Sequence, residues 1–271
     1  MNITLGIVKN IDFQFWLNSN EYYSSDKLST NVNTGIKHAK KAGLIEKLVN
    51  NIKSNAELVN LIEERINLQE SASAYSDEEL LIIFDLIQAW GGPTGRNPYV
   101  FQNRPRITNP QHFASTYRAT VEMLYQLSDI EDYAKDVAPI KNKLEELPQV
   151  SESFSTKHLS FWSRFLKNCP ELVIYDTRMR DIIKAANKHV EEANITYKNF
   201  RLALLQEAQA LGLDINEIER AIFAFSSNYF KNDNFVLRAK PKINHPDKAI
   251  AYELINDSNP KKCLLQKIFT N

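Results

Sequence analysis

The sequence has little glycine and little cysteine. Seven glycines among 271 residues favour long helices over a β fold that is rich in glycine turns. The two cysteines, Cys169 and Cys263, are too few to ligate a four-cysteine iron–sulfur cluster. Met1 to Trp16 lacks the basic start and apolar run of a secretory signal, so we expect two reduced thiols in a cytoplasmic protein.

Other absences exclude further classes of protein. No segment is apolar for long enough to span a membrane. No phosphate-binding loop or dinucleotide fingerprint is present. The five histidines are scattered along the chain, and none forms a ligand cluster with another histidine or with cysteine. We therefore expect no membrane partner, no metal site and no cofactor.

Charge is balanced overall but unevenly distributed. The chain has 33 basic and 33 acidic residues. Residues 91–118 contain four arginines and no acid, residues 153–188 contain seven basic and three acidic residues, and residues 57–85 contain eight acidic residues and one arginine. A basic face of this kind binds phosphates as a uniformly basic protein does. A solvated helix face explains any one of these runs equally well.

Apolar residues recur at helical spacing along most of the chain and predict an all-α fold. Ser76 with Glu79, and Asp214 with Glu217, have the pattern of capping boxes, which mark helix starts. The expected helices cover residues 33–51, 55–68, 77–90, 111–127, 130–147, 157–166, 177–193, 196–211 and 214–229, and a short strand is expected at 235–238.

A lysine and an aspartate stand at the start of two consecutive predicted helices. Lys157 follows Ser155 and Thr156, either of which can cap helix 157–166, and Asp176 can cap the next helix. Backbone N–H groups at a helix N-terminus bind anions. The sequence therefore predicts an amine, a carboxylate and a phosphate cradle at neighbouring helix ends. These are the groups that cleavage of a base–sugar bond in DNA needs.

Three short segments carry a resemblance to a known family: Leu147-Pro148-Gln149-Val150, Ser155-Thr156-Lys157 and Tyr175-Asp176-Thr177-Arg178-Met179. They resemble the helix–hairpin–helix DNA glycosylases, in particular the 8-oxoguanine DNA glycosylase branch, in which a lysine closes the hairpin and an aspartate opens the next helix. The resemblance covers about residues 145–184. It implies a glycosylase-like helical fold, either one unit over residues 1–271 or two lobes, about 70–145 and 146–230, with the termini packed across them and a DNA cleft between. Gln149 and residues 151–155 replace the Gly-Val-Gly of the family's hairpin.

Lys157 and Asp176 would have complementary roles in such an enzyme. Partial desolvation and the dipole of a helix N-terminus disfavour the ammonium form of a lysine and free an amine. The Lys157 amine would attack C1′ of the deoxyribose and displace the base, and the resulting Schiff base can eliminate the 3′ phosphate. Asp176 would stabilise positive charge on the sugar, or orient the lysine or a water. Taken separately, each residue is better explained as a surface lysine or a helix cap.

Other residues are candidates for contact with DNA or with the excised base. The candidates for the DNA backbone are Ser155, Thr156, His158, Arg178 and Arg180. Because a base must leave the duplex before it is excised, Arg96 and Asn97 in the loop 91–106 would fill the gap or bond the orphaned base. Trp90 and Phe225 are candidates for the base pocket, although core packing is the commoner role of aromatic residues at helical spacing. Packing or solvated faces are the alternatives for the polar residues.

The leading interpretation is a DNA glycosylase, with or without AP-lyase activity, acting as a monomer on double-stranded DNA that contains a modified base. The base would be an oxidised purine such as 8-oxoguanine, or a hypermodified base of phage DNA in antiviral defence. A non-catalytic helical DNA-binding module would keep the basic face without needing Lys157. A protein-interaction scaffold would use the acidic residues of 57–85 as its contact surface.

Overall fold

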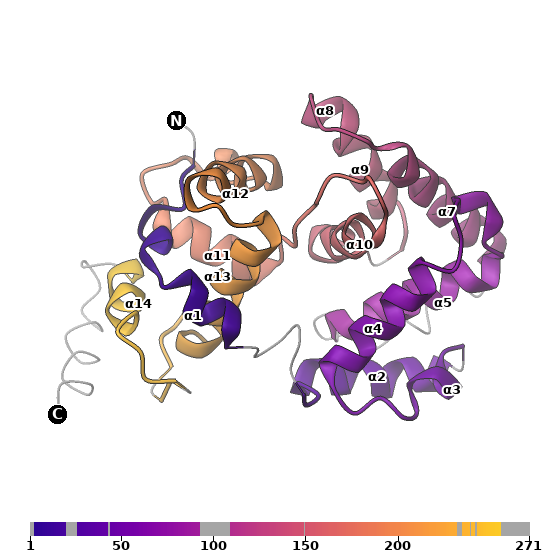
Figure 1. Ribbon diagram of the computed structural model, residues 1–271, viewed down its shortest axis with the longest axis horizontal. Helices are drawn as coiled ribbons and strands as arrows, with labels where there is room; N and C mark the ends of the chain where they lie inside the picture. Colours follow the sequence, from indigo (N-terminus) through magenta and orange to yellow (C-terminus); the bar gives the residue numbers. More distant parts are fainter. Residues whose placement is uncertain are drawn as a thin grey trace. The chain divides into compact units, whose positions relative to one another are not determined.

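The computed structural model describes residues 3–19, 26–42, 44–92, 109–148, 150–231, 235–238, 240–241 and 243–255. These residues form helices joined by turns and extended segments, with no β-sheet among them (Figure 1). The all-α prediction is confirmed. In place of the short strand expected at 235–238, a single antiparallel bridge joins Phe230 to Leu237.

The helices fall into two compact units. Unit 1 comprises Met1–Ser19 and Thr177–Asn271, and unit 2 comprises Asn20–Asp176. The boundary that was expected near residue 145 therefore falls directly after Asp176. Lys157 and Asp176 belong to the same unit, so the geometry between them is internal to it.

Unit 2 contains α2 (Thr30–Ala42), α3 (Glu46–Val49), α4 (Asn55–Ile66), the 3₁₀ helix η2 (Ala72–Ala74), α5 (Asp77–Gly91), α7 (Pro110–Gln126), α8 (Tyr133–Asp136), α9 (Ala138–Glu145) and α10 (Glu152–Phe165). Two predicted helices are each divided. Residues 33–51 form α2 and α3, and residues 130–147 form α8 and α9. Pro139 is the second residue of α9, because a proline lacks the N–H that would continue α8 but is well suited to a first turn.

α5 lies at the centre of unit 2 and is buried along most of its length. Its predicted capping box is present, since Ser76 and Glu79 each bond the other's backbone N–H. The helices α2, α4, α7 and α10 pack against it. Gly35 allows α2 to approach α5 closely, because a Cβ at this position would lie 2.1 Å from the carbonyl oxygen of Ala89.

Unit 1 contains the 3₁₀ helices η1 (Gly6–Asn10) and η3 (Glu192–Asn194), with α1 (Phe13–Asn18), α11 (Thr177–Ala186), α12 (Tyr197–Leu211), α13 (Ile215–Tyr229) and α14 (Lys248–Leu254). Its two chain segments are joined by polar contacts. Asp247 accepts hydrogen bonds from the Trp16 indole and from the backbone N–H of Asp12. Asn187 bonds both backbone groups of Thr4. These contacts build the N-terminal residues into the C-terminal part of the chain.

Candidate active site

A hairpin between α9 and α10 precedes the candidate lysine. α9 ends at Glu145 and α10 begins at Glu152. Within the connection, the N–H of Val150 donates to the carbonyl of Leu147 at 3.1 Å. A helix–hairpin–helix therefore forms without the glycines of the family pattern. Gln149 lies outside the described part of the chain.

α10 starts earlier than the sequence predicts. Ser151 precedes its first residue, so the expected caps Ser155 and Thr156 lie inside the helix. Their side chains bond within the unit: the Ser155 hydroxyl donates to Glu145 Oε1 at 2.8 Å and the Thr156 hydroxyl to the carbonyl of Glu152 at 2.9 Å. Both residues are fully buried. Both hydroxyls are therefore bonded inside the unit in this structure, and the contacts of Ser155 and Thr156 with DNA stay predictions.

An ion-pair cluster fastens the hairpin. Lys141 Nζ lies 2.8 Å from Glu145 Oε1 and 3.3 Å from Glu152 Oε1, and its side chain is 12% exposed. The two carboxylates come from the two helices that the hairpin joins. Because Glu152 places a negative charge in the first turn of α10, the helix N-terminus is already complemented. This weakens the predicted phosphate cradle at that helix end.

An extended segment returns along α10 and carries Asp176 back to the lysine. Residues 172–175 are buried. Ser163 Oγ accepts the N–H of Leu172 at 2.9 Å, and Thr156 Oγ1 accepts the N–H of Tyr175 at 3.1 Å. Two hydroxyls on one helix thus set the register of the segment. They bring Asp176 beside Lys157 although the two residues are far apart along the chain.

Lys157 and Asp176 meet in the folded unit. Lys157 Nζ lies 3.8 Å from Asp176 Oδ2, and their side chains are 6% and 18% exposed. The ammonium also donates to Ser153, at 2.9 Å to the hydroxyl and 3.2 Å to the carbonyl. It lies 4.9 Å from the centre of the Phe154 ring, within the range of a cation–π contact. The pair is therefore a partly buried amine and a more accessible carboxylate.

The position of Lys157 along the helix differs from the prediction. It does not open α10, which starts at Glu152. The field of a helix N-terminus is strong only within the first turn, so the predicted effect of the dipole on the amine does not apply. Burial of the side chain remains as the factor that disfavours the ammonium form, whereas the face of the Phe154 ring, the oxygens of Ser153 and the Asp176 carboxylate favour it. Asp176 directly precedes α11, where the sequence placed it.

Gly91 closes one side of the lysine. A Cβ at this position would lie 3.1 Å from Lys157 Cδ and 2.6 Å from Cε1 of the Phe154 ring. The end of α5 is thus in direct contact with the methylene chain of the lysine. The sequence indicated Gly91 only as a helix stop, and the structure adds a packing role beside the candidate site.

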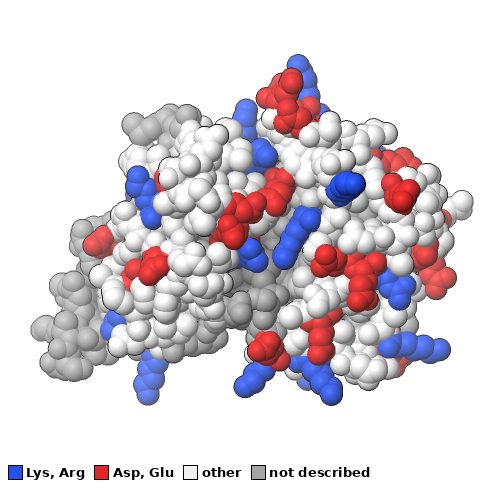
Figure 2. All heavy atoms as spheres, in the orientation of Figure 1, with Lys and Arg blue, Asp and Glu red and all other residues white. Residues whose placement is uncertain are grey.

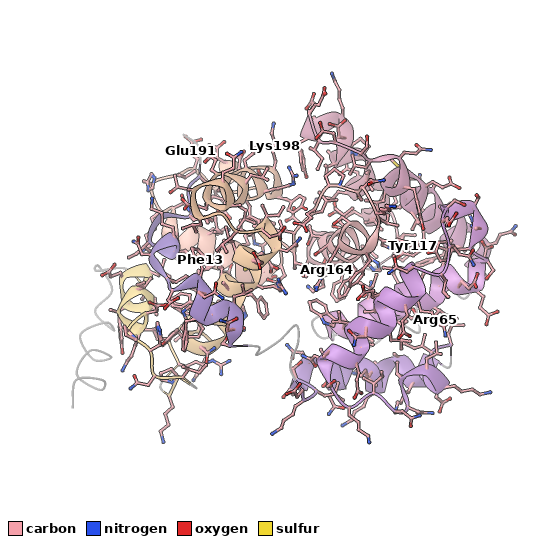
Figure 3. All side chains as sticks on the ribbon, viewed as in Figure 1. Phe13, Arg65, Tyr117, Arg164, Glu191 and Lys198 are labelled. Carbon is pink, nitrogen blue, oxygen red and sulfur yellow. The ribbon has the colours of Figure 1, made fainter. Side chains whose placement is uncertain are left out.

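His158 belongs to a buried polar network and not to a DNA-binding surface. Tyr117, labelled in Figure 3, projects from α7 toward α10. Its hydroxyl accepts the indole N–H of Trp162 at 2.8 Å and lies 2.9 Å from His158 Nδ1. The Gln88 amide nitrogen lies 3.3 Å from His158 Nε2, and because an amide nitrogen only donates, Nε2 of the neutral ring accepts. His158 then carries its proton on Nδ1 and donates it to the Tyr117 hydroxyl.

The environment of His158 keeps the imidazole neutral. The ring is fully buried and stacks on Phe84, with centroids 4.6 Å apart. Burial, and to a lesser degree the charge of Lys157, lower the pKa of His158 from 6.5 to about 3. Burial also raises the pKa of Tyr117. A neutral, hydrogen-bonded ring directly after Lys157 adds no positive charge that would compete with the ammonium.

The two aromatic candidates for a base pocket are core residues. Trp90 is 1% exposed and packs edge-on against Phe161 in unit 2. Phe225 is fully buried and packs on Trp16 and Tyr229 in unit 1. Both side chains therefore pack in a core in this structure, and their roles in a base pocket stay predictions. Core packing, the alternative at helical spacing, describes both.

The arginine candidates have different surroundings. Arg178 donates to the carbonyls of Ser226 and Phe230, so it supports the end of α13, and its predicted contact with DNA is not needed to explain it. Arg180 is half-buried, and its role in binding DNA stays a prediction. Arg96 and Asn97 lie outside the described residues.

Charges are mixed on the drawn face of the molecule. Figure 2 shows basic side chains interspersed with acidic ones over the described residues, and no continuous basic surface is visible on this face. Arg118, from the arginine-rich run 91–118, pairs with Asp77 at 2.7 Å and also donates to the carbonyl of Ala72. This arginine joins α7 to the start of α5. These contacts explain Arg118 without a phosphate.

Two residues of the site had no role in the sequence analysis. Ser153 bonds the lysine amine, and Ser163 ties the returning segment. A serine four residues before a lysine on one helix lies on the same face, so the spacing from Ser153 to Lys157 was an available signal. The role of Ser163 depends on a contact with a distant segment, which local spacing does not reveal.

An all-helical chain in which a lysine amine and a carboxylate meet after a helix–hairpin–helix has the features of a base-excising DNA glycosylase. Residues 57–223 match the family model described as Putative 8-oxoguanine DNA glycosylase OGG-like protein. The match spans more than half of the 271 residues, so the chain belongs to this family. It includes both Lys157 and Asp176. No curated protein and no solved structure was found to match the chain.

Family membership supports a DNA glycosylase and therefore DNA as the partner. Within the described ranges, no helix is long and apolar enough to cross a membrane. In the same part of the chain, no group of three or more His, Cys, Asp or Glu residues could hold a metal ion.

Proposed function

We propose that the protein is a DNA glycosylase that excises a modified base through Lys157 as the nucleophile. The observation that carries the proposal is the 3.8 Å approach of Lys157 Nζ to Asp176 Oδ2 in a partly buried site. Family membership supports an enzyme that acts on DNA. The first substrate to test is 8-oxoguanine in duplex DNA, because the family description names this base.

The proposed reaction begins with a neutral Lys157 amine. Its electron pair forms a bond to C1′ while the glycosidic C1′–N bond breaks. The base leaves with the electron pair of the broken bond and takes up a proton. The nitrogen loses a proton, the C1′–O4′ bond opens, and O4′ is protonated, which leaves an iminium. Loss of a C2′ proton then expels the 3′ phosphate, the lyase step, or water hydrolyses the iminium and frees the lysine.

Asp176 is proposed to act on charge and protons in this sequence. Its carboxylate is more exposed than the amine, so it can face the sugar as positive charge develops at C1′ and O4′. It can also accept the proton that the ammonium must lose before attack. Both roles need the carboxylate close to Lys157, which the tether from Thr156 to Tyr175 supports.

Borohydride trapping tests the proposal directly. The wild-type protein is expected to become covalently linked to an 8-oxoguanine duplex after reduction, and Lys157→Ala is expected to lose this product while still binding DNA. Lys143→Ala is the matched control, because Lys143 is a more exposed lysine on α9. If Lys157→Ala gave the trapped product in the same yield as the wild-type protein, the proposal would be refuted. Equal base release without any trapping would assign the chemistry to water.

The identity of the base is tested in the same assay. Parallel duplexes carry 8-oxoguanine, hypermodified cytosines of the phage type, or unmodified bases. Preference for the phage-type duplexes would replace the oxidised purine by a hypermodified base and would point to antiviral defence. If no duplex yields base release or a trapped product, and the protein binds DNA at low salt, where phosphate contacts are strongest, a non-catalytic DNA-binding module becomes the better description.

A further inference from the structure

Ser153 offers the lysine amine two acceptors at once. Its hydroxyl oxygen lies 2.9 Å and its backbone carbonyl oxygen 3.2 Å from Lys157 Nζ. The two residues are one helical turn apart on α10, and long side chains in a helix lean toward the preceding turn. The amine is therefore drawn back along the helix onto one residue.

This contact has a consequence for the direction of the amine. A tetrahedral nitrogen bonded to Cε has three further directions. When two of them hold N–H groups directed at the oxygens of Ser153, the third holds the remaining N–H group, and Asp176 Oδ2 lies 3.8 Å from the nitrogen. In the ammonium form that direction holds the third proton. After that proton is lost, the same direction holds the electron pair that attacks carbon.

We propose that Ser153 is a positioning residue for the Lys157 nucleophile. By binding two N–H groups, it directs the reactive electron pair of the neutral amine to the side of Asp176, where the sugar must lie. Gly91 supports this arrangement by holding the methylene chain of the lysine, since its Cα leaves only enough space for Lys157 Cδ. The inference rests on the proposed function, because it concerns the direction of attack on C1′.

The test uses a DNA duplex with an abasic site, so that the result does not depend on the excised base. Single-turnover borohydride trapping is measured for wild type, Ser153→Ala, Ser153→Thr and Lys157→Ala. Ser160→Ala is the matched control, because it also removes a serine hydroxyl from α10, seven residues further along the helix. Binding to the same duplex is measured separately, and unfolding by urea confirms that each variant is folded.

Ser153→Ala is expected to slow trapping about tenfold at saturating protein, the factor that corresponds to one ordinary hydrogen bond. Its affinity for DNA should stay within about twofold of wild type, and Ser153→Thr should recover most of the rate because it keeps a hydroxyl. Ser160→Ala should trap at the wild-type rate. If Ser153 had only a structural role, Ser153→Ala would change the stability of the protein but would not slow trapping while leaving the affinity for DNA unchanged.

The outcomes separate the inference from the proposed function. If wild type is trapped, Lys157→Ala is not, and Ser153→Ala equals wild type, the role of Ser153 is refuted while the lysine nucleophile stands. A slow Ser153→Thr, equal to the alanine variant, refutes the hydroxyl as the positioning group. If wild type is trapped no better than Lys157→Ala, the nucleophile itself is refuted, and the role of Ser153 with it.

Discussion

His158 should make the protein less stable in mild acid. In the folded protein its pKa is lowered to about 3, chiefly by burial and then by Lys157, whereas an exposed histidine has a pKa of 6.5. Below pH 6.5, His158 therefore binds a proton in the unfolded chain but stays neutral in the folded protein. Stability falls as the pH drops from about 6.5, and the loss levels off below about 3.

The size of this loss follows from the pKa difference. Each pH unit below 6.5 lowers the free energy of unfolding by about 1.4 kcal/mol until the folded pKa is reached. Between about pH 7 and pH 5 the expected loss from His158 alone is therefore about 2 kcal/mol. Carboxylates titrate mostly below this window, so the window isolates the effect of histidine.

The assay is urea unfolding followed by tryptophan fluorescence, measured at several pH values across this window. Trp162 reports on the relevant network, because its indole N–H bonds Tyr117, which bonds His158. His158→Asn keeps a polar amide near the position of Nδ1 but cannot titrate. This variant is expected to be less stable than wild type at pH 7, by about 1–3 kcal/mol, because it loses the ring packing.

The decisive quantity is the slope of stability with pH. His158→Asn should lose about 2 kcal/mol less than wild type between about pH 7 and pH 5. His112→Asn is the matched control, since His112 is exposed on α7 in the same unit, and it should keep the wild-type slope. Equal slopes in wild type and His158→Asn would refute the reasoning that burial holds this ring neutral.

Three further substitutions test the surroundings of the lysine. Asp176→Asn should slow base release at least tenfold with little change in DNA binding, and an unchanged single-turnover rate would contradict its role. Thr156→Val removes the tether of the returning segment; it should cost about 1 kcal/mol of stability in urea unfolding and slow trapping, and wild-type values for both would refute the tether. Gly91→Ala places a Cβ 2.6 Å from the Phe154 ring; it should cost about 1–3 kcal/mol and slow trapping through displacement of Lys157, whereas wild-type trapping would show that the lysine tolerates this shift.

The helices were predictable where local signals agreed with one another. α5 and α13 begin at the predicted capping boxes, because these depend on residues three apart and on nothing distant. α10 was placed too late along the chain. The serines at 151, 153 and 155 are all acceptable caps, and Ser151 becomes the start of the helix in a hairpin that Lys141 fastens through Glu152. The spacing of residues within α10 does not show which of these serines precedes the helix.

The candidate site was predictable in its chemistry but not in its environment. The resemblance identified Lys157 and Asp176, whereas their approach also needs the extended segment that Ser163 and Thr156 hold along α10. The polar residues beside the lysine, Thr156 and His158, were assigned to DNA because they are polar and adjacent to it. The structure buries both. Burial depends on contacts with α5, α7 and the returning segment, which a local pattern does not reveal.

The position of Lys157, the proposed nucleophile, depends on the core of unit 2 more than on a helix end. His158 fixes α10 to α5 and α7 through Gln88 and Tyr117, while Thr156 fixes it to the segment that carries Asp176. Lys157 lies between these two residues in sequence, so a rotation of α10 that moved the amine would break contacts on both sides. A fixed amine is an advantage for attack on one carbon, because reactivity depends steeply on the direction of approach. It follows that substitutions in the core network can lower reactivity without contacting DNA, and that they should act through the rate of trapping and not through affinity.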